Sequence, residues 1–260
     1  VGSVVGGLRA AVGEAVTQGQ ERRVVAADEA RPEAVAKRHG RGQRTARENV
    51  ADLCDPGSFE EYGGFAIAAQ TGRRSRAELQ TATPADGLIT GIGRVNGDLV
   101  PEHQARCAVV AYDYTVLAGT QGYRNHTKKD RMFDIATRYR LPIVFFTEGG
   151  GGRPGDTDSM GSIGMEVPTF TMFSQLSGLV PLVGLNSGRC FAGNTSILAC
   201  CDVIIATENA TLRRVSRSPE NSERTASRTA SSVARPLPWI EWSSVLRVWK
   251  IAIGTHRSAS

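Results

Sequence analysis

The chain has 260 residues and a formal net charge of +5 at neutral pH, enough for one sizeable core with extensions. No apolar run approaches the roughly 20 residues of a membrane span, and the basic excess lies at the two ends, so we expect neither a membrane protein nor a nucleic-acid binder. The five cysteines lack metal-site spacing, and no secretory signal opens the chain, so we expect reduced thiols, no metal and a cytoplasmic location.

The first quarter of the chain predicts little regular structure before one helix. Residues 1–30, rich in Ala, Gly and Val without a clear period, are expected to form an irregular extension. The basic segment 31–54 is expected to lead into a helix, because Thr45 and Glu48 have the spacing of a capping box. Turns are predicted at 55–58 and 84–87, and the alternating residues after the second turn predict a strand.

The middle of the chain alternates between strand and helix patterns. Strands are predicted over 107–117, 143–146, 180–185 and 202–207, and helices over 122–139, 168–177 and 195–201. This alternation predicts a layered α/β domain over about 50–210. We expect Ile143–Phe146 and Val180–Leu185 to be neighbouring core strands.

The composition changes after Ala210. Residues 211–235 are rich in Ser, Arg and Thr, which cannot bury enough apolar surface to offset the entropy of ordering. We therefore predict a disordered tail over 211–260, in which the Trp-containing segment Trp239–Trp249 does not join the core.

A glycine run is the most informative feature. Gly149 to Gly152 directly follow the predicted strand 143–146, and Arg153, Pro154 and Gly155 come next. Glycine lets a ligand approach the backbone closely, so this loop predicts a site made of backbone N–H groups. Such donors suit a phosphate or an oxyanion formed during a reaction.

Several chemistries use loops of this kind. A phosphate loop requires a Lys and a hydroxyl after its last glycine, whereas Asp156 stands here. The string GxGxxG is present, but the next predicted strand ends in Asn186 and Ser187 instead of an acidic residue. An oxyanion hole for an acyl thioester and a glycine loop without chemistry stay open.

Several longer motifs of the chain resemble those of a known protein family. The chain closely resembles the N-terminal half of the carboxyltransferase domain of biotin-dependent acyl-CoA carboxylases over about residues 31–210. The matching segments, in order, are LCDPGSFEEYG (53–63), TPADGLITGIGRVNG (83–97), AYDYTVLAGTQG (111–122), the glycine loop and LVPLVGLNSGRCFAGN (179–194). The resemblance implies a crotonase-type fold of ββα units wound into a superhelix, incomplete in this chain.

The resemblance also implies an activity, a cofactor and partners. In this family a carboxyl group passes from carboxybiotin to the α-carbon of an acyl-CoA through an enolate held by backbone N–H groups. The expected partners are a biotin carboxyl carrier protein, a biotin carboxylase domain, and further copies or another chain supplying the C-terminal half. Carboxybiotin would arrive on such a partner, and the acyl group cannot be read from these residues.

Site residues follow from matching the family motifs. The register places the oxyanion hole on Gly150 and Gly151. Substrate-binding positions are then expected at Gly149, Gly152, Arg153, Phe191, Ala192, Gly193, Asn194 and Lys128. For Lys128 and Lys129, solvated charges on a helix face are the simpler interpretation. Four arginines are alternative contacts for the CoA phosphates, although ordinary surface charge is the simpler interpretation for them too: Arg38, Arg41, Arg44 and Arg47. An exposed or capping role is expected for His126.

One departure from the family leaves other functions open. After residue 210 the chain does not continue with the Gly-rich segment and the second half that carry the biotin-side hole. A non-catalytic acyl-CoA-binding fragment or an inactive truncation product is therefore an alternative. A single-domain hydratase is a further one, although it would need paired acidic residues beside the loop, whereas Glu148 precedes the glycines and Glu166 lies well downstream.

Overall fold

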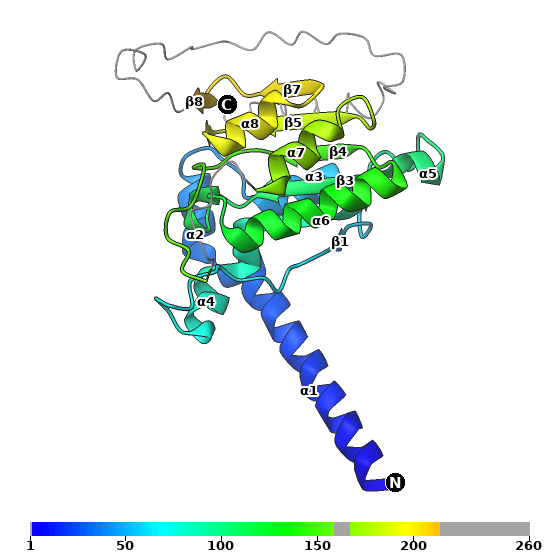
Figure 1. Ribbon diagram of the computed structural model, residues 1–260, viewed down its shortest axis with the longest axis vertical. Helices are drawn as coiled ribbons and strands as arrows, with labels where there is room; N and C mark the ends of the chain where they lie inside the picture. Colours follow the sequence, from blue (N-terminus) through cyan, green and yellow to red (C-terminus); the bar gives the residue numbers. More distant parts are fainter. Residues whose placement is uncertain (1, 159–166, 214–260) are drawn as a thin grey trace.

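The computed structural model describes residues 2–158 and 167–213. A six-stranded sheet lies at the centre, and helices cover both of its faces (Figure 1). Its strands are β1 (Glu60–Glu61), β2 (Leu88–Arg94), β3 (Arg106–Tyr112), β4 (Ile143–Phe146), β5 (Leu182–Asn186) and β7 (Val203–Ala206). The layered α/β architecture predicted for the middle of the chain is confirmed.

The sheet follows the order of the sequence, β1-β2-β3-β4-β5-β7. The β1–β2 and β2–β3 pairs are antiparallel, and β3, β4, β5 and β7 are parallel. The predicted adjacency of 143–146 and 180–185 is confirmed, with Ile143 opposite Leu182 and Phe146 opposite Leu185. Because parallel strands end at the same edge, the segments that follow β3, β4, β5 and β7 meet there.

Side chains that alternate along each strand build two cores. On one face Val144 and Phe146 pack with Val50 and Leu53 of α3 (Ala46–Leu53). On the other face Ile143 and Phe145 pack under α6 (Tyr123–Tyr139), α7 (Pro168–Gln175) and α8 (Gly193–Ala199), the helices at the front of Figure 1. A strand buried on both sides must be apolar throughout, which explains the sequence IVFF.

Local signals account for several element boundaries. Thr45 and Glu48 form the predicted capping box at the start of α3. The strand predicted over 107–117 ends earlier, at Tyr112, because the Asp113 carboxylate accepts hydrogen bonds from the Thr115 N–H and hydroxyl and turns the chain. The remaining short elements are η1 (Asp28–Ala30), α2 (Pro32–His39), α4 (Arg76–Ala82), η2 (Pro84–Gly87), α5 (Glu102–Ala105) and η3 (Leu117–Gly119).

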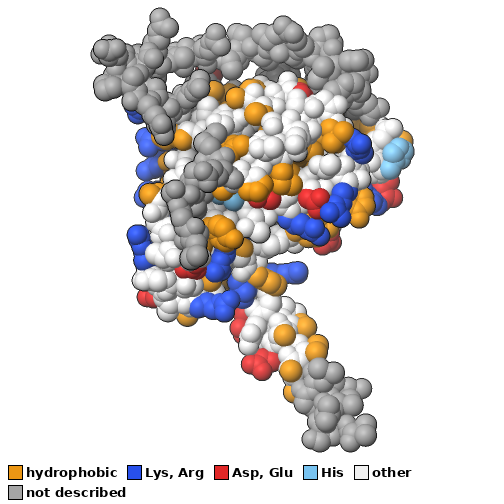
Figure 2. Space-filling view, viewed as in Figure 1, with side chains coloured by type: hydrophobic (Ala, Val, Ile, Leu, Met, Phe, Trp, Pro, Cys, Tyr) orange, Lys and Arg blue, Asp and Glu red, His pale blue; other side chains and the backbone are white. Residues whose placement is uncertain are grey.

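The N-terminal segment differs from the expectation. The predicted irregular extension over 1–30 is wrong in its secondary structure, since α1 (Gly2–Ala26) is one long helix that projects from the body (Figures 1 and 2). Its Ala, Glu, Gln and Arg residues are strong helix formers, and they outweigh the scattered glycines. Near its end Arg22 lies 5.0 Å from the centre of the Phe65 ring and anchors the helix to the body.

The first three residues of the predicted tail have regular structure. Residues Thr211–Arg213 form β8, which pairs in parallel with β6 (Arg189–Phe191), so the expectation of disorder is wrong for these three residues. The rest of the predicted tail, 214–260, lies outside the described residues.

Candidate functional site

The glycine loop lies at the edge where the parallel strands end. It leaves β4 and runs beside β6, where the Gly149 N–H donates to Arg189 O at 2.7 Å and the Phe191 N–H donates to Gly149 O at 2.9 Å. The turn that leads into α8 directly follows β6. The two segments that the family motifs predicted to line one site, 149–153 and 191–194, are therefore brought together in the structure.

A second segment holds the other side of the loop. The Gln121 N–H donates to Gly151 O at 2.7 Å, and the Arg153 N–H donates to Gln121 O at 2.9 Å. The Gly150 N–H donates to Ala118 O at 2.9 Å. The loop is thus held between η3 with its following residues on one side and β6 on the other.

A buried chain of side chains runs under the loop. Lys129 Nζ donates to Tyr112 Oη at 2.9 Å and to Gln121 Oε1 at 2.5 Å. Gln121 Nε2 donates to Asn194 Oδ1 at 2.9 Å, and this oxygen also accepts the Gly151 N–H at 3.1 Å. Lys129, Gln121 and Asn194 are all at most 1% exposed. We call Lys129, Gln121, Asn194 and Gly151 the buried relay.

These contacts differ from the predicted donor geometry. The N–H groups of Gly150 and Gly151, on which the family register places the oxyanion hole, both donate within the protein, to Ala118 O and Asn194 Oδ1. Gly152 is exposed, and its N–H has no partner among the described residues. The oxyanion role of Gly150 and Gly151 stays a prediction, and of the three N–H groups only that of Gly152 has no partner among the described residues.

Steric requirements separate the glycines of the loop. Gly151 has φ +87°, and a Cβ there would lie 2.9 Å from the Ala192 Cβ. A Cβ at Gly149 would overlap the Asn194 side chain, and one at Gly150 would lie 2.9 Å from the Thr120 methyl group. A Cβ at Gly152 would meet nothing within 4 Å. Packing therefore requires glycine at 149 and 151, whereas Gly152 borders open space.

The turn before α8 has a constrained backbone. Ala192 has φ 48° and ψ −117°, a conformation that non-glycine residues rarely adopt. Its N–H donates to Arg213 O at 3.0 Å, so β8 helps to fix the turn. Phe191 and Gly193, expected to contact substrate, flank it and are partly exposed.

Arg153, expected to bind substrate, is buried and points inward. Its guanidinium donates to the Asp86 carboxylate and to Thr120 O, the latter at 2.8 Å. Burial raises the pKa of Asp86, and the positive charge of Arg153 opposes that rise. In this structure Arg153 ties the turn of η2 to the end of the glycine loop.

The residue before the glycines forms a second buried ion pair. Arg38 donates to both carboxylate oxygens of Glu148, at 2.8 and 2.7 Å, with side chains 7% and 9% exposed. Arg38 was an alternative contact for the CoA phosphates, and its guanidinium is instead occupied by Glu148. Arg44 pairs with Asp52, and Arg47 pairs with Glu61.

The expectation of solvated side chains on α6 is wrong. Lys128 donates to the carbonyl oxygens of Ala85 and Leu88, and burial lowers the pKa of Lys128 to about 8. His126 is buried with its Nδ1 2.8 Å from Thr169 Oγ1, and burial lowers the pKa of His126 to about 3. The substrate-binding role expected for Lys128 stays a prediction, because its amine is held by two backbone carbonyls.

The burial of Lys129 had a signal in the sequence. Lys129 stands three, four and seven residues before Met132, Phe133 and Ala136, which form the apolar face of α6. Residues at this spacing share one face of a helix. The position of Lys129 on the helix, and not its charge, indicates that this side chain is buried.

A small pocket lies at the same sheet edge as the loop. It has a volume of about 110 Å³. It is lined by Arg41, Gly42, Gln43, Arg44, Asn49, Ser187, Thr207 and Asn209. Thr207 Oγ1 is buried there without a partner among the described residues. The pocket therefore combines two arginines with an unused hydroxyl beside the ends of β5 and β7.

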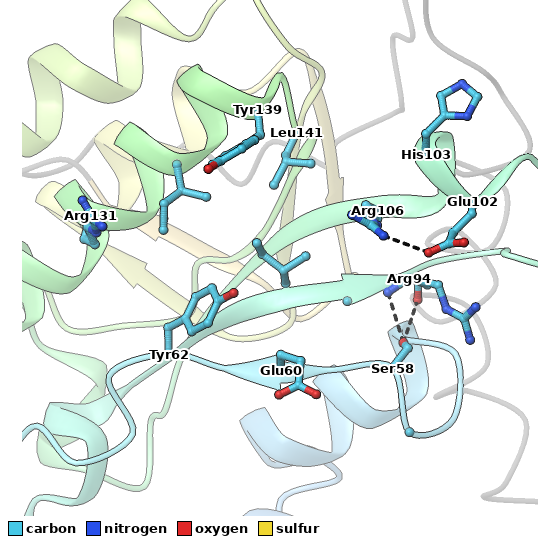
Figure 3. Close-up of a pocket in the computed structure, with 14 residues that line it drawn as sticks. Ser58, Glu60, Tyr62, Arg94, Glu102, His103, Arg106, Arg131, Tyr139 and Leu141 are labelled. Carbon is cyan, nitrogen blue, oxygen red and sulfur yellow. Dashed lines mark hydrogen bonds and ion pairs between the residues drawn. The ribbon is translucent and has the colours of Figure 1, made fainter.

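A large cleft lies at the opposite end of the strands (Figure 3). It has a volume of about 1,070 Å³ and is bordered by β1, β2 and the end of α6. Arg106 pairs with Glu102 at 2.8 Å on its wall, and Tyr62 and Tyr139 add aromatic surface. No motif of the sequence indicates this cleft, and no residue of the glycine loop lines it.

Two further observations concern metal ions and membranes. Over 2–158 and 167–213, no group of three or more His, Cys, Asp or Glu side chains could hold a metal ion. Within the same residues, no helix has the length and apolar character that crossing a bilayer requires. Cys54, Cys107 and Cys190 are buried free thiols.

Solved structures define the class of fold. One described as a single-chain, multi-domain long-chain acyl-CoA carboxylase matches with a TM-score of 0.72 and 58% identity, over 76% of this chain and 19% of that chain. A transcarboxylase 12S hexamer matches with a TM-score of 0.60 and 28% identity, over 76% of this chain and 36% of that one. The fold is that of the crotonase-type carboxyltransferases, and this expectation is confirmed.

Sequence comparisons give the family. The carboxyl transferase domain model matches residues 37–214. The methylmalonyl-CoA carboxyltransferase 12S subunit of Propionibacterium freudenreichii is 34% identical over 181 residues, which cover 68% of this chain and 31% of that protein. The mitochondrial propionyl-CoA carboxylase beta chain of Homo sapiens is 30% identical over 155 residues, covering 60% and 27%. The chain belongs to the carboxyl transferase domain family, and it spans about a third of the length of these relatives.

Proposed function

We propose that this chain forms the acyl-CoA-binding half of a carboxyltransferase that works with carboxybiotin. The observation that carries the proposal is the glycine loop held against the turn before α8, with open space beside Gly152. The α-carbon of the acyl-CoA would give its proton to the biotin nitrogen that the departing carboxyl group leaves, and the loop would bind the negative oxygen of the resulting enolate. Carboxybiotin, carried by a partner, would supply the carboxyl group that the α-carbon takes up.

The loop supplies backbone donors where negative charge develops. The Gly152 N–H has no partner among the described residues, whereas Gly150 and Gly151 could donate to the oxygen only by giving up their bonds to Ala118 and Asn194. A backbone donor of this kind is worth about 3–4 kcal/mol of transition-state stabilisation in other enzymes. We therefore place the thioester carbonyl beside Gly152.

The CoA phosphates would lie in the small arginine pocket. The Arg41 side chain has no charged partner among the described residues, and Arg44 lies beside it in the lining. Gln43 links this pocket to the loop, because Arg38 bonds both Gln43 and Glu148. A phosphate group suits two guanidinium groups and a hydroxyl.

We propose that partner proteins supply the other parts of the reaction. The described residues present one glycine loop, so we assign only the acyl-CoA side to this chain. A biotin carboxyl carrier protein, a biotin carboxylase and a second half, supplied by another copy or another chain, complete the proposed assembly in the cytoplasm.

A second candidate is acyl-CoA binding without catalysis. The observation in its favour is that the N–H groups of Gly150 and Gly151 already have partners within the chain. A hydratase has less support, because Glu148 is occupied by Arg38, and Glu166 lies outside the described residues.

Calorimetric titration with acetyl-, propionyl- and methylcrotonyl-CoA tests the proposal. Gly152→Val should weaken binding at least tenfold, because its side chain fills the open space without a clash inside the protein. Gly13→Ala is the matched control, since a Cβ at Gly13 also meets nothing within 4 Å but lies on α1. Wild-type affinity in Gly152→Val would place the thioester elsewhere.

Free CoA, which lacks the acyl group, separates the two parts of the site. Arg41→Gln should weaken binding of both free CoA and acyl-CoA, whereas Gly152→Val should weaken binding of acyl-CoA alone. Carboxyl transfer after addition of a carboxylated biotin carrier and the second half distinguishes catalysis from binding.

A further inference from the structure

We propose that Lys129 is a positioning residue, which sets the direction of the hydrogen bonds in the buried relay and so keeps the Gly151 N–H turned into the protein. The proposal deepens the proposed function and rests on it for the consequence in acyl-CoA binding. Its structural part concerns the loop alone and can be tested without ligand.

Burying the Lys129 amine costs free energy, which its hydrogen bonds must offset. The residue is 0% exposed, and it lies on the apolar face of α6 between the helix and the sheet. Nζ makes its hydrogen bonds to two uncharged oxygens, Tyr112 Oη and Gln121 Oε1. A buried amine without a bonded carboxylate is much less favourable than an apolar side chain of the same length.

The chemistry of an ammonium group fixes the direction of each link. Burial lowers the pKa of Lys129, but in its charged form the amine only donates, and in the structure Gln121 turns its carbonyl oxygen toward it. The Gln121 NH₂ group then faces Asn194 and requires an acceptor there, which is Asn194 Oδ1 at 2.9 Å. That oxygen is left in place to accept the Gly151 N–H at 3.1 Å.

The last link determines which backbone donor of the loop is outward. With its N–H on Asn194, Gly151 takes φ +87°, and the following Gly152 N–H has no partner among the described residues. If the Asn194 amide were reversed, its NH₂ group would face the Gly151 N–H, and two donors would oppose each other. Lys129, which does not reach the loop itself, thus acts on the loop through two amides, and the Asn194 NH₂ group also lies 3.4 Å from Gly119 O and from Thr147 O.

Gln121→Glu is the sharpest test. The carboxylate introduced at this position would keep a bond from Lys129 and gain an ion pair, so the fold is supported. It cannot donate to Asn194, whose amide would reverse to donate to the new carboxylate. We expect hydrogen–deuterium exchange of the amides at 149–153 to become about tenfold faster and acyl-CoA affinity to fall about tenfold, the size of one lost hydrogen bond.

Lys129→Met is the second variant. It removes the ammonium group but keeps the length of the side chain, so the direction of the two amides is no longer imposed. Faster exchange at 149–153 and weaker acyl-CoA binding are expected here as well. The melting temperature should be equal to that of wild type or higher. A role in packing alone would change the melting temperature and leave exchange in the loop unchanged.

Thr169→Val is the matched control. Thr169 is fully buried and bonds His126 and Asp130 of α6, but it does not touch the relay. It should lower stability and leave exchange at 149–153 and acyl-CoA affinity at wild-type values. Wild-type exchange in Gln121→Glu would overturn the proposal, and so would equally fast exchange in Thr169→Val. If the wild-type chain binds no acyl-CoA, the proposed function fails, and the exchange measurement still decides on the relay.

Discussion

The two ends of the parallel strands differ in how far their ion pairs are exposed to solvent. At the carboxyl end, beside the glycine loop, Arg38 and Glu148 pair with side chains 7% and 9% exposed. At the amino end, on the wall of the large cleft, Arg106 and Glu102 pair with side chains 55% and 67% exposed. Near α5, acidic and basic side chains lie together on the surface (Figure 2).

The difference in exposure decides whether water can replace a lost partner of an ion pair. An exposed pair exchanges its partner for water at little cost, so it contributes little to stability. A buried pair has no such replacement, and losing one member leaves a charge in an apolar environment. The larger cleft is therefore the less constrained end, and the smaller, polar end is where single substitutions should have large effects.

The largest expected effect is at the Arg38–Glu148 pair. Arg38→Leu leaves Glu148 buried without its partner, and we expect a loss of about 3–5 kcal/mol in the free energy of unfolding. Urea denaturation measures it. Replacing both residues with Leu removes the unpaired charge, so the double variant should recover most of the loss. A single variant as stable as wild type would show that water reaches Glu148.

A smaller effect is expected within the glycine loop. Gly151→Ala forces a side chain into a left-handed backbone conformation, which costs about 1–2 kcal/mol. Gly152→Ala has open space and should stay within about 0.5 kcal/mol of wild type. Thermal unfolding of the two variants compares them directly. Equal losses would contradict the separation of the glycines by packing. Gly151→Val is for the same reason a poor probe of substrate binding.

The third effect depends on pH. The pKa of His126 is lowered to about 3 by burial, so between pH 3 and about 6.5 the unfolded chain binds a proton that the folded chain does not. This contribution to stability is present above pH 6.5 and is lost as the pH falls, with a slope of at most about 1.4 kcal/mol per pH unit. Unfolding at pH 5 to 6.5, above the range of most carboxylates, measures it. His126→Gln should flatten the slope; an unchanged slope would assign it to other groups.

The smallest effect is expected at the large cleft. Glu102→Gln removes an exposed ion pair with Arg106, and its melting temperature should equal that of wild type within error. A clear drop would mean that the amino end is more constrained than its exposure indicates.

The sequence predicted the framework of this fold better than its polar contacts. The strand IVFF, its neighbour β5, the length of α6 and the capping box at Thr45 follow from local patterns, which physical chemistry ties to one structure. The family motifs also assign 149–153 and 191–194 to one site, and these two segments are in contact in the structure. Patterns of this kind depend on neighbours along the chain, and such neighbours can be read directly.

The polar contacts depend on residues that are distant along the chain. Gly150 and Gly151 donate to Ala118 and Asn194, which no spacing in the glycine run indicates. Lys128 and Lys129 were interpreted by their charge, although Lys129 has the helical spacing of the apolar face. In both cases tertiary contacts decide which group donates and which is buried, and only a structure supplies them.

The order of the strands has a consequence for how the chain folds during synthesis. Apart from the small β6–β8 pair, each strand pairs with the one made before it, so the sheet can grow along one edge as the polypeptide emerges. The glycine loop is made before its partners β6 and Asn194. A nascent chain therefore carries a loop held only by Ala118 and Gln121 until about residue 194 is added, and β7 completes the sheet after that.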